Sequence, residues 1–141
     1  MLVYLAGPID NVGHNEAGMW RQSVSEILKR HGIACYDPFG AFRNVEKSVH
    51  AEAVNSINMT ALDVCDIVFA YFNPDVISIG TSMEISTSKR PVYVWCTKKE
   101  AAEKLLSTFV LGNNVRVMHE QFLNDAIQFM VDDIGDRNEL T

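Results

Sequence analysis

Residues 67 to 84 read IVFAYFNPDVISIGTSME, and this stretch decides the fold because a short loop joins a buried strand to a helix. Its first six residues are β-branched, aromatic or small, which is typical of a strand that is apolar on both faces. The same alternation runs along the chain. It predicts further strands at 2–7, 33–36, 91–96 and 115–118, and helices at 16–32, 49–66, 80–90, 98–109 and 119–134.

This alternation predicts an α/β fold with a doubly wound, flavodoxin-like or Rossmann-like five-stranded parallel sheet and helices on both faces. The expected strand order is 2-1-3-4-5. We expect one domain over residues 1–134, a polar loop at 39–48 and a loose tail at 135–141. In this order the chain reverses between strands 1 and 3, which opens a crevice between the loops at 7–16 and 73–84.

Composition narrows the class of protein. The 141 residues are 48% hydrophobic with a net charge of -6, and no basic stripe favours polymeric nucleic acid. No apolar run reaches the ~20 residues of a membrane helix, so we expect a cytoplasmic protein without membrane contact. Cys35, Cys65 and Cys96 indicate reduced core residues, and the four histidines show no metal-ligand spacing. The sequence predicts neither a metal nor a cofactor.

Glu84 has two readings. Thr81 and Glu84 have the spacing of a capping box, in which each side chain satisfies a free N–H group at the start of a helix. Thr97 and Glu100 repeat that spacing. Only Glu84 follows strand 3, at the expected crevice, whereas Glu100 follows strand 4. Position therefore favours Glu84 as the functional residue.

The two crevice loops carry the expected ligand contacts. Glycine allows close approach to the backbone, and the hydroxyl groups surround a helix N-terminus that favours anions. Neither G-x-G-x-x-G nor G-x-x-x-x-G-K-[ST] occurs, which disfavours dinucleotide oxidoreductases and nucleotide triphosphatases. The expected substrate-binding residues are Gly7, Pro8, Ile9, Asp10, Trp20, Asp37, Ser78, Gly80, Thr81 and Ser82.

Several motifs together resemble the nucleoside 2-deoxyribosyltransferase family. They occur in the family's order and at its usual spacing, over about residues 2–95. The motifs are YLAGPI (4–9), a helix containing Trp20, YDP (36–38), CDIVFAYF (65–72), GTSMEI (80–85) and RPV (90–92).

The resemblance implies that Glu84 attacks C1′ of a 2′-deoxyribose and expels the base, with Tyr4 beside the nucleophile or sugar. A carboxylate suits an oxocarbenium-like transition state, and a covalent intermediate divides one difficult displacement into two. A second nucleobase then makes a transferase, and water makes a hydrolase. We expect the helix N-terminus to keep Glu84 ionised.

One position departs from the family. Members carry an aspartate eight residues before the aspartate that opens strand 3, and here that position is Asn58. An amide orients or hydrogen-bonds a base but delivers no proton. Asp10 and Asp37 are the alternative acids, each with a turn or cap role as its ordinary reading. Asn58 also keeps open a third reading, a catalytically weak nucleotide-binding module.

The substrate is a free deoxynucleoside or a 5′-monophosphate. Ser78 stands where the family's monophosphate N-glycosidases place a phosphate-binding serine, whereas Pro8 and Asp10 disfavour an anion. Arg21 and Arg43 are the cations available to compensate. We favour free deoxynucleosides.

Packing roles compete with function elsewhere in the chain. Trp20 and Phe39 either stack on a base or pack in the interior. Met59, Met83, Met118 and Met130 are expected to fill gaps in the core. The resemblance further implies a homodimer or larger homo-oligomer with shared active sites, to which Asn113 and Asn114 would contribute.

Overall fold

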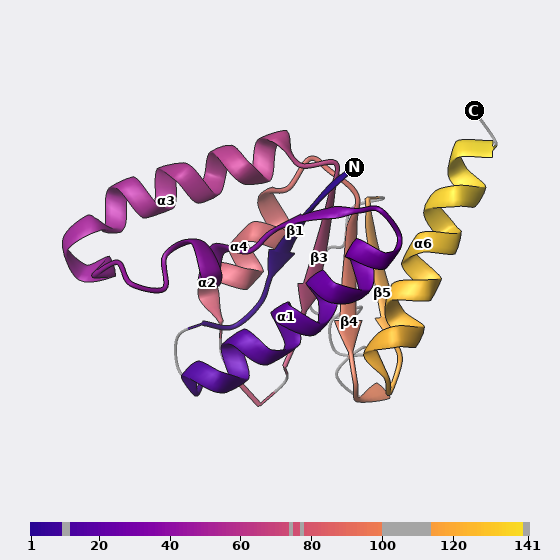
Figure 1. Ribbon diagram of the computed structural model, residues 1–141, viewed down its shortest axis with the longest axis horizontal. Helices are drawn as coiled ribbons and strands as arrows, with labels where there is room; N and C mark the ends of the chain where they lie inside the picture. Colours follow the sequence, from indigo (N-terminus) through magenta and orange to yellow (C-terminus); the bar gives the residue numbers. More distant parts are fainter. Residues whose placement is uncertain (10–11, 74, 77, 100–113, 140–141) are drawn as a thin grey trace.

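The computed structural model describes residues 1–9, 12–73, 75–76, 78–99 and 114–139 (Figure 1). Five strands form one all-parallel sheet in the order β2-β1-β3-β4-β5, which confirms the predicted fold class. The strands are β1 (Leu2–Ala6), β2 (Ala34–Tyr36), β3 (Ile67–Tyr71), β4 (Val92–Cys96) and β5 (Val115–His119).

Helices join the strands. They are α1 (His14–Arg30), α2 (Pro38–Ala41), α3 (Lys47–Val64), α4 (Ile79–Thr87) and α6 (Leu123–Glu139). The predicted helix at 98–109 and the Thr97–Glu100 pair lie largely outside the described residues. None of the described helices has the length and apolarity needed to cross a bilayer.

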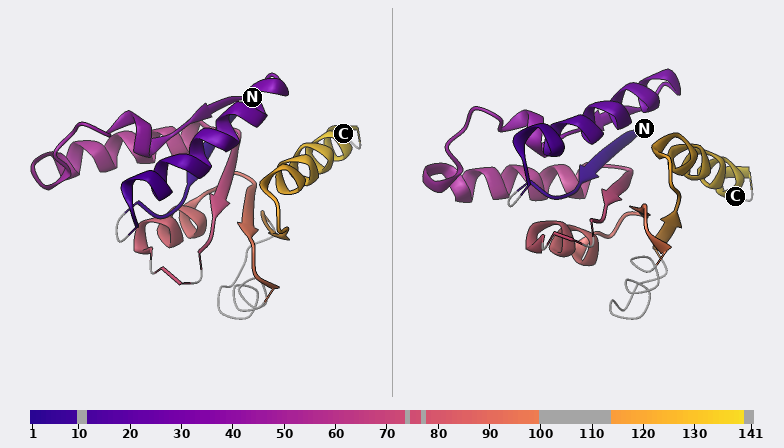
Figure 2. Two further views of the ribbon diagram at one scale, coloured as in Figure 1. Left: turned by 60° about the horizontal axis from the view of Figure 1, so that its bottom comes forward. Right: turned by 90° about the horizontal axis from the view of Figure 1, so that it is seen from below.

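The sheet lies between two layers of helices (Figure 2), and each layer covers an apolar cluster. On one face, α1 and α6 lie side by side and cover a cluster that includes Leu5, Leu28 and Ile127. On the other, α3 and α4 cover a cluster that includes Leu62 and Ile85. Helices therefore cover both faces, as predicted.

The central strands explain the topology. The sequences of β1, β3 and β4 are apolar on both faces, and nearly all of their residues are buried. The edge strands β2 and β5 are more exposed. This difference follows from helices packing on both sides of the sheet centre.

Two predicted boundaries were wrong. The expected polar loop at 39–48 contains most of α2, which begins because Asp37 accepts a hydrogen bond from the Phe39 N–H group and Pro38 occupies the first turn. The expected loose tail is helical as far as Glu139. An ion pair of 3.1 Å between Arg137 and Asp133, one turn apart, supports that extension.

Methionine burial agrees with the prediction at only two of four positions. Met118 and Met130 are buried, but Met59 and Met83 are exposed on α3 and α4.

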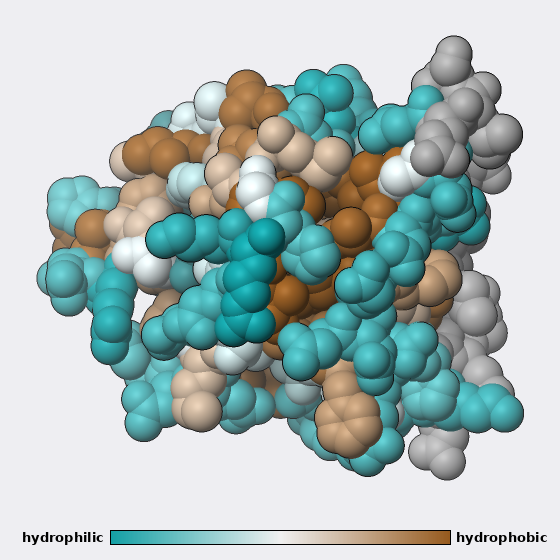
Figure 3. Space-filling view, turned by 45° about the vertical axis from the view of Figure 1, so that its right-hand side comes forward, coloured by the Kyte–Doolittle hydropathy of each residue, from teal (hydrophilic) through white to brown (hydrophobic). Residues whose placement is uncertain are grey.

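The side that carries α6 presents mostly hydrophilic residues, with hydrophobic ones showing between them near the middle of the face (Figure 3). Cys65 and Cys96 are buried and Cys35 is half-buried, all three as free thiols.

Candidate active site

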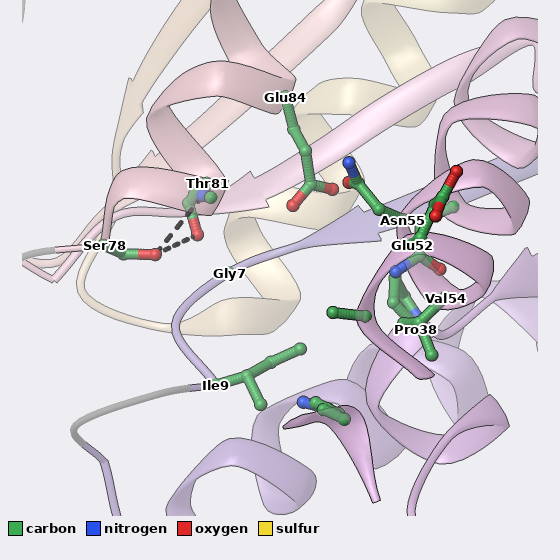
Figure 4. A pocket seen from close by; sticks show the side chains of 13 residues that line it. Gly7, Ile9, Pro38, Glu52, Val54, Asn55, Ser78, Thr81 and Glu84 are labelled. Carbon is green, nitrogen blue, oxygen red and sulfur yellow. Dashed lines mark hydrogen bonds between the residues drawn. The ribbon is translucent and has the colours of Figure 1, made fainter. Parts of the chain in front are cut away.

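A pocket of about 630 Å³ opens where the chain leaves β1 and β3 (Figure 4). The sheet edge and α4 form one wall, and α3 forms the other. The lining residues are Gly7, Ile9, Pro38, Lys47, Ala51, Glu52, Val54, Asn55, Asn58, Ser78, Gly80, Thr81 and Glu84. Glu84, Asn58, Gly7, Ile9, Ser78, Gly80 and Thr81 are thus brought together from the predicted set.

The start of α4 positions Glu84. Ser78, not Thr81, is the N-cap, because its hydroxyl accepts a hydrogen bond of 3.3 Å from the Thr81 N–H group. The two hydroxyl oxygens lie 2.6 Å apart. The helix begins at Ile79, so Glu84 lies in the second turn, beyond the free N–H groups that a capping box would satisfy. Of the two readings of Glu84, the capping box with Thr81 is therefore wrong, and the Glu84 side chain is free to point into the pocket.

The Glu84 carboxyl group is largely shielded from water. Burial raises its pKa, while a hydrogen bond with Tyr4 and the charge of Arg21 act in the opposite direction. Its Oε2 atom is buried and has no hydrogen-bond partner among the described residues. We expected the helix N-terminus to keep Glu84 ionised. Glu84 lies beyond the first turn of α4, where the effect of the dipole fades, so burial outweighs that effect and the pKa of Glu84 rises. A buried carboxyl oxygen without a partner is a group that a ligand can satisfy.

Tyrosines link Glu84 to Asn58. Tyr4 is buried in β1, and burial together with the charge of Glu84 raises the pKa of its hydroxyl well above the usual value. Tyr4 therefore stays protonated and donates to the carboxylate. Its ring stacks on Tyr36 at 5.6 Å, and the Tyr36 hydroxyl donates to Asn58 Oδ1 at 3.0 Å. Since its carbonyl is occupied, Asn58 presents amide N–H donors.

Helix α3 supplies a wall that the sequence analysis largely missed. Glu52, Val54 and Asn55 line the pocket, and Glu84 points from α4 toward Asn55 (Figure 4). Asn55 precedes Asn58 by three residues, the spacing that places side chains on one face of a helix. The signal was present in the sequence: once Asn58 was a candidate, the position one turn earlier should have been one too.

Other predicted site residues lie elsewhere. Asp37 caps α2 and lies 3.3 Å from Arg21 Nε, so it supports the fold and does not line the pocket. Pro8 also lies outside the lining, with its carbonyl bonded to Arg21, and Ser82 donates to the Ser78 carbonyl at 3.0 Å. Asp10 lies outside the described residues.

The two candidate stacking residues have packing roles. Trp20 contacts Phe69 and Tyr71, and a β-carbon placed on Gly7 would clash with its ring. Glycine is therefore required there by the close approach of the indole. Phe39 is buried, with an edge contact to His14 at 4.8 Å. Neither aromatic lines the Glu84 pocket.

The remaining candidate residues also form contacts within the protein itself. Arg21 is buried and Arg43 contacts His14, so the expected roles of both in binding phosphate lack support. The Asn114 amide donates to the carbonyl groups of Ser88 and Arg90 at 3.1 and 2.9 Å, whereas Asn113 lies outside the described residues. No cluster of three metal-binding side chains occurs in the described part of the chain.

Comparison with known proteins supports the resemblance to the nucleoside 2-deoxyribosyltransferase family. The family model for nucleoside 2-deoxyribosyltransferase matches residues 3–139. One similar structure is a 2-deoxyribosyltransferase from Bacillus psychrosaccharolyticus, with a TM-score of 0.64 and 14% identity over 86% of this chain and 88% of that one. A conserved protein from Enterococcus faecalis V583 has a TM-score of 0.63 and 15% identity, over 97% and 98%. No curated protein matches.

The two structural similarities are too low in identity to show more than a shared fold, but the family model spans nearly the whole chain. It includes the pocket, both of its walls and the sheet beneath them. The chain belongs to the nucleoside 2-deoxyribosyltransferase family.

Proposed function

We propose that this protein cleaves the N-glycosidic bond of 2′-deoxynucleosides and transfers the deoxyribose to another nucleobase. The observation that carries the proposal is the Glu84 carboxyl group, which points into the pocket and has one oxygen without a hydrogen-bond partner in the part of the chain that the structure describes. A buried carboxylate near the sugar carbon stabilises an oxocarbenium-like transition state, because little water is present to screen it.

In the proposed first step, a Glu84 oxygen forms a bond to C1′ while the C1′–N bond breaks and its electron pair leaves with the base. The departed base takes up a proton from water. The nitrogen of a second base then attacks C1′, the C1′–carboxylate bond breaks, and the second base releases a proton to water, so that no net proton is consumed. Tyr4 donates to Glu84 and orients it. Desolvation makes the ionised carboxylate a stronger nucleophile, although a smaller fraction is ionised at low pH.

Departure of the base is proposed to depend on hydrogen bonding. The side-chain carbonyl of Asn58 accepts a hydrogen bond from Tyr36, so its N–H groups are available to acceptor atoms on the base or sugar. Asn55 on the same wall adds a second amide. Without a proton donor at either position, we expect slow turnover with bases that leave poorly.

A specific observation favours a second candidate, hydrolysis of deoxynucleoside 5′-monophosphates. Ser78, the N-cap of α4, and Lys47, the first residue of α3, both line the pocket. However, the Ser78 hydroxyl already contacts Thr81, and Glu52 lines the same pocket with a negative charge that offsets the positive charge of Lys47. Free deoxynucleosides therefore remain the proposed substrate.

We also propose that the protein works as a homodimer or larger homo-oligomer with shared active sites. Large apolar side chains are exposed on the helices beside the pocket, which is the typical composition of a surface covered by another subunit. They are Val49, Ile57, Met59 and Val64 on α3 and Met83 on α4. Sedimentation of the purified protein measures the state directly, and a monomer with full activity would contradict the proposal.

The test of function uses a panel of deoxynucleosides and their 5′-monophosphates, with and without a second base, followed by mass spectrometry of the bases. We expect base exchange with wild type and a loss of at least about 10³-fold in Glu84→Gln. Peptide mapping should show a deoxyribosyl group on Glu84 when the acceptor is omitted. Release without exchange would indicate a hydrolase, and binding without turnover would indicate a binding module.

A further inference from the structure

Arg21 on α1 is a fully buried cation behind the pocket. Its Nη1 donates to the carbonyl groups of Ala17 at 2.7 Å and Pro8 at 3.2 Å. Its Nη2 donates to the Gly7 carbonyl at 2.8 Å, and its Nε lies 3.3 Å from Asp37 Oδ1. One side chain thus joins the loop after β1, the helix α1 and the end of β2.

The guanidinium group is also held by aromatic rings. Its central carbon lies 4.5 Å from the ring centre of Trp20 and 5.8 Å from that of Phe39. Trp20 packs closely on Gly7, so the loop after β1 is held by the indole and by Arg21 together. That loop places Gly7 and Ile9 in the lining of the pocket.

The charge of Arg21 acts on Glu84. Burial lowers the pKa of the guanidinium to about 10, opposed by the negative charges of Asp37 and Glu84, so it remains charged at neutral pH. In return, Arg21 counteracts the rise in the pKa of Glu84. Burying a cation that only held a loop would be costly, since apolar packing or a neutral donor serves that purpose.

We propose that Arg21 is a positioning residue for the proposed reaction: it fixes the loop after β1 and provides the internal positive charge that favours ionised Glu84. Asp37 sets how much of that charge Glu84 experiences. The proposal rests on the assigned role of Glu84 as nucleophile, but its electrostatic part is measurable without any substrate.

Other charged or titratable groups also face Glu84. Tyr4 of β1 donates to it, and Tyr36 of β2 stacks behind Tyr4. Lys47 and Glu52 line the pocket from α3 with opposite charges that partly cancel. Removing the charge of Arg21 or Asp37 therefore changes the potential at Glu84 in a direction that these groups do not reverse.

The experiment titrates the side-chain carboxyl resonances of ¹³C-glutamate-labelled protein by NMR, with the resonance missing in Glu84→Gln assigned to Glu84. We expect the titration midpoint of Glu84 to fall in Asp37→Asn. This substitution removes a negative charge beside Arg21 and retains a residue able to cap α2. We expect the midpoint to rise in Arg21→Gln, which removes the positive charge. Matched controls, Asp75→Asn and Arg116→Gln, change exposed ion-pair partners and should leave the midpoint unchanged.

An unchanged midpoint in folded Asp37→Asn would overturn the proposal, and this variant decides the question alone if Arg21→Gln fails to fold. Turnover then separates the two proposals. If deoxynucleosides are substrates, the acidic limb of the kcat profile should move in the same direction as each midpoint. If the midpoints move but wild type turns over no substrate, the proposed function fails while the electrostatic role of Arg21 stands.

Discussion

The two walls of the pocket are built differently. On the sheet side, Glu84 is shielded, Tyr4 is buried in β1, and α4 packs against β1 and β3. On the other side, only Val54 and Leu62 are buried among the 18 residues of α3, and the helix extends past the edge of the sheet (Figure 1). The sheet-side wall is therefore the more firmly packed of the two. Under the proposed function it holds the nucleophile, and the α3 wall contacts the substrate.

The α3 wall also has a break near its start. The backbone at His50 departs from helical geometry, with φ of -113° and ψ of 20°. Lys47 belongs to the part before that break, whereas Asn55 and Asn58 belong to the part after it. The pocket thus combines residues of the well-packed sheet side with residues of α3, a helix that has few buried side chains.

Leu62→Ala has the largest expected effect on stability and tests how α3 is held. Leu62 is only 2% exposed, and deleting its buried side chain should lower the free energy of unfolding by about 3 kcal/mol. Substrate affinity should fall with it, because Asn55 and Asn58 share the helix. Chemical denaturation and hydrogen exchange of α3 amides measure both effects.

The control is Thr60→Ala, two residues earlier on the same helix. Thr60 is exposed and lies outside the apolar set proposed to meet another subunit, so the change should be within about 0.5 kcal/mol. Equal losses in the two variants, or a negligible loss in Leu62→Ala, would remove the contrast between the walls and point to α3 being held by another subunit.

Glu84→Gln tests how much the buried carboxylate of Glu84 destabilises the sheet-side wall, by its effect on the free energy of unfolding. Burial raises the pKa of Glu84 in the folded protein, so folding becomes less favourable as pH rises from the unfolded pKa, near 4.5, through the folded value. A neutral amide avoids that cost. We expect the variant to be more stable than wild type at pH 7, by about 2 kcal/mol, the scale of a poorly satisfied buried polar group.

The pH dependence separates this effect from a general change in packing. Below the unfolded pKa of Glu84, both folded and unfolded wild type carry a protonated carboxyl group, so the stability gap should close. Thermal melts of both proteins from pH 4 to pH 8 measure it. A gap that stays constant over this range would mean that ionisation of Glu84 costs the fold nothing.

Much of the fold was readable in the sequence because the central strands are apolar on both faces and alternate with helices. That pattern implies a parallel sheet, and the order 2-1-3-4-5 then brings the loops after β1 and β3 to one edge. Glu84 could be placed beside a crevice for this reason, even though its spacing from Thr81 suggested a cap. Local spacing alone could not distinguish Ser78 from Thr81 as the cap.

The electrostatic environment of Glu84 was not readable. It depends on how far Tyr4, Arg21 and α4 exclude water together, and these groups are distant in sequence. Asp37 illustrates the same limit: the sequence offered both a cap and an acid reading, and only folding makes it the cap of α2 and the partner of Arg21. Burial and pairing assign such roles, and both arise only after folding.

Asn58→Asp has the smallest expected effect and asks whether the α3 wall can be given a chemical role. The introduced carboxyl group can still accept from the Tyr36 hydroxyl, and the nearby negative charge of Glu84 should raise its pKa. It would then hold a proton in mildly acidic solution and pass it to the leaving base. We expect kcat to rise about tenfold near pH 6 and the gain to vanish at higher pH, a modest contribution for a general acid.

Asn55→Asp provides the matched control, since it adds the same charge to the same wall one turn earlier and without the contact to Tyr36. Rates measured with one base that leaves easily and one that leaves poorly should diverge only in Asn58→Asp, because protonation helps the poorer leaving group more. If both variants are slower at every pH, added negative charge simply opposes ionisation of Glu84. The α3 wall would then serve recognition alone, and leaving-group assistance would have to come from outside it.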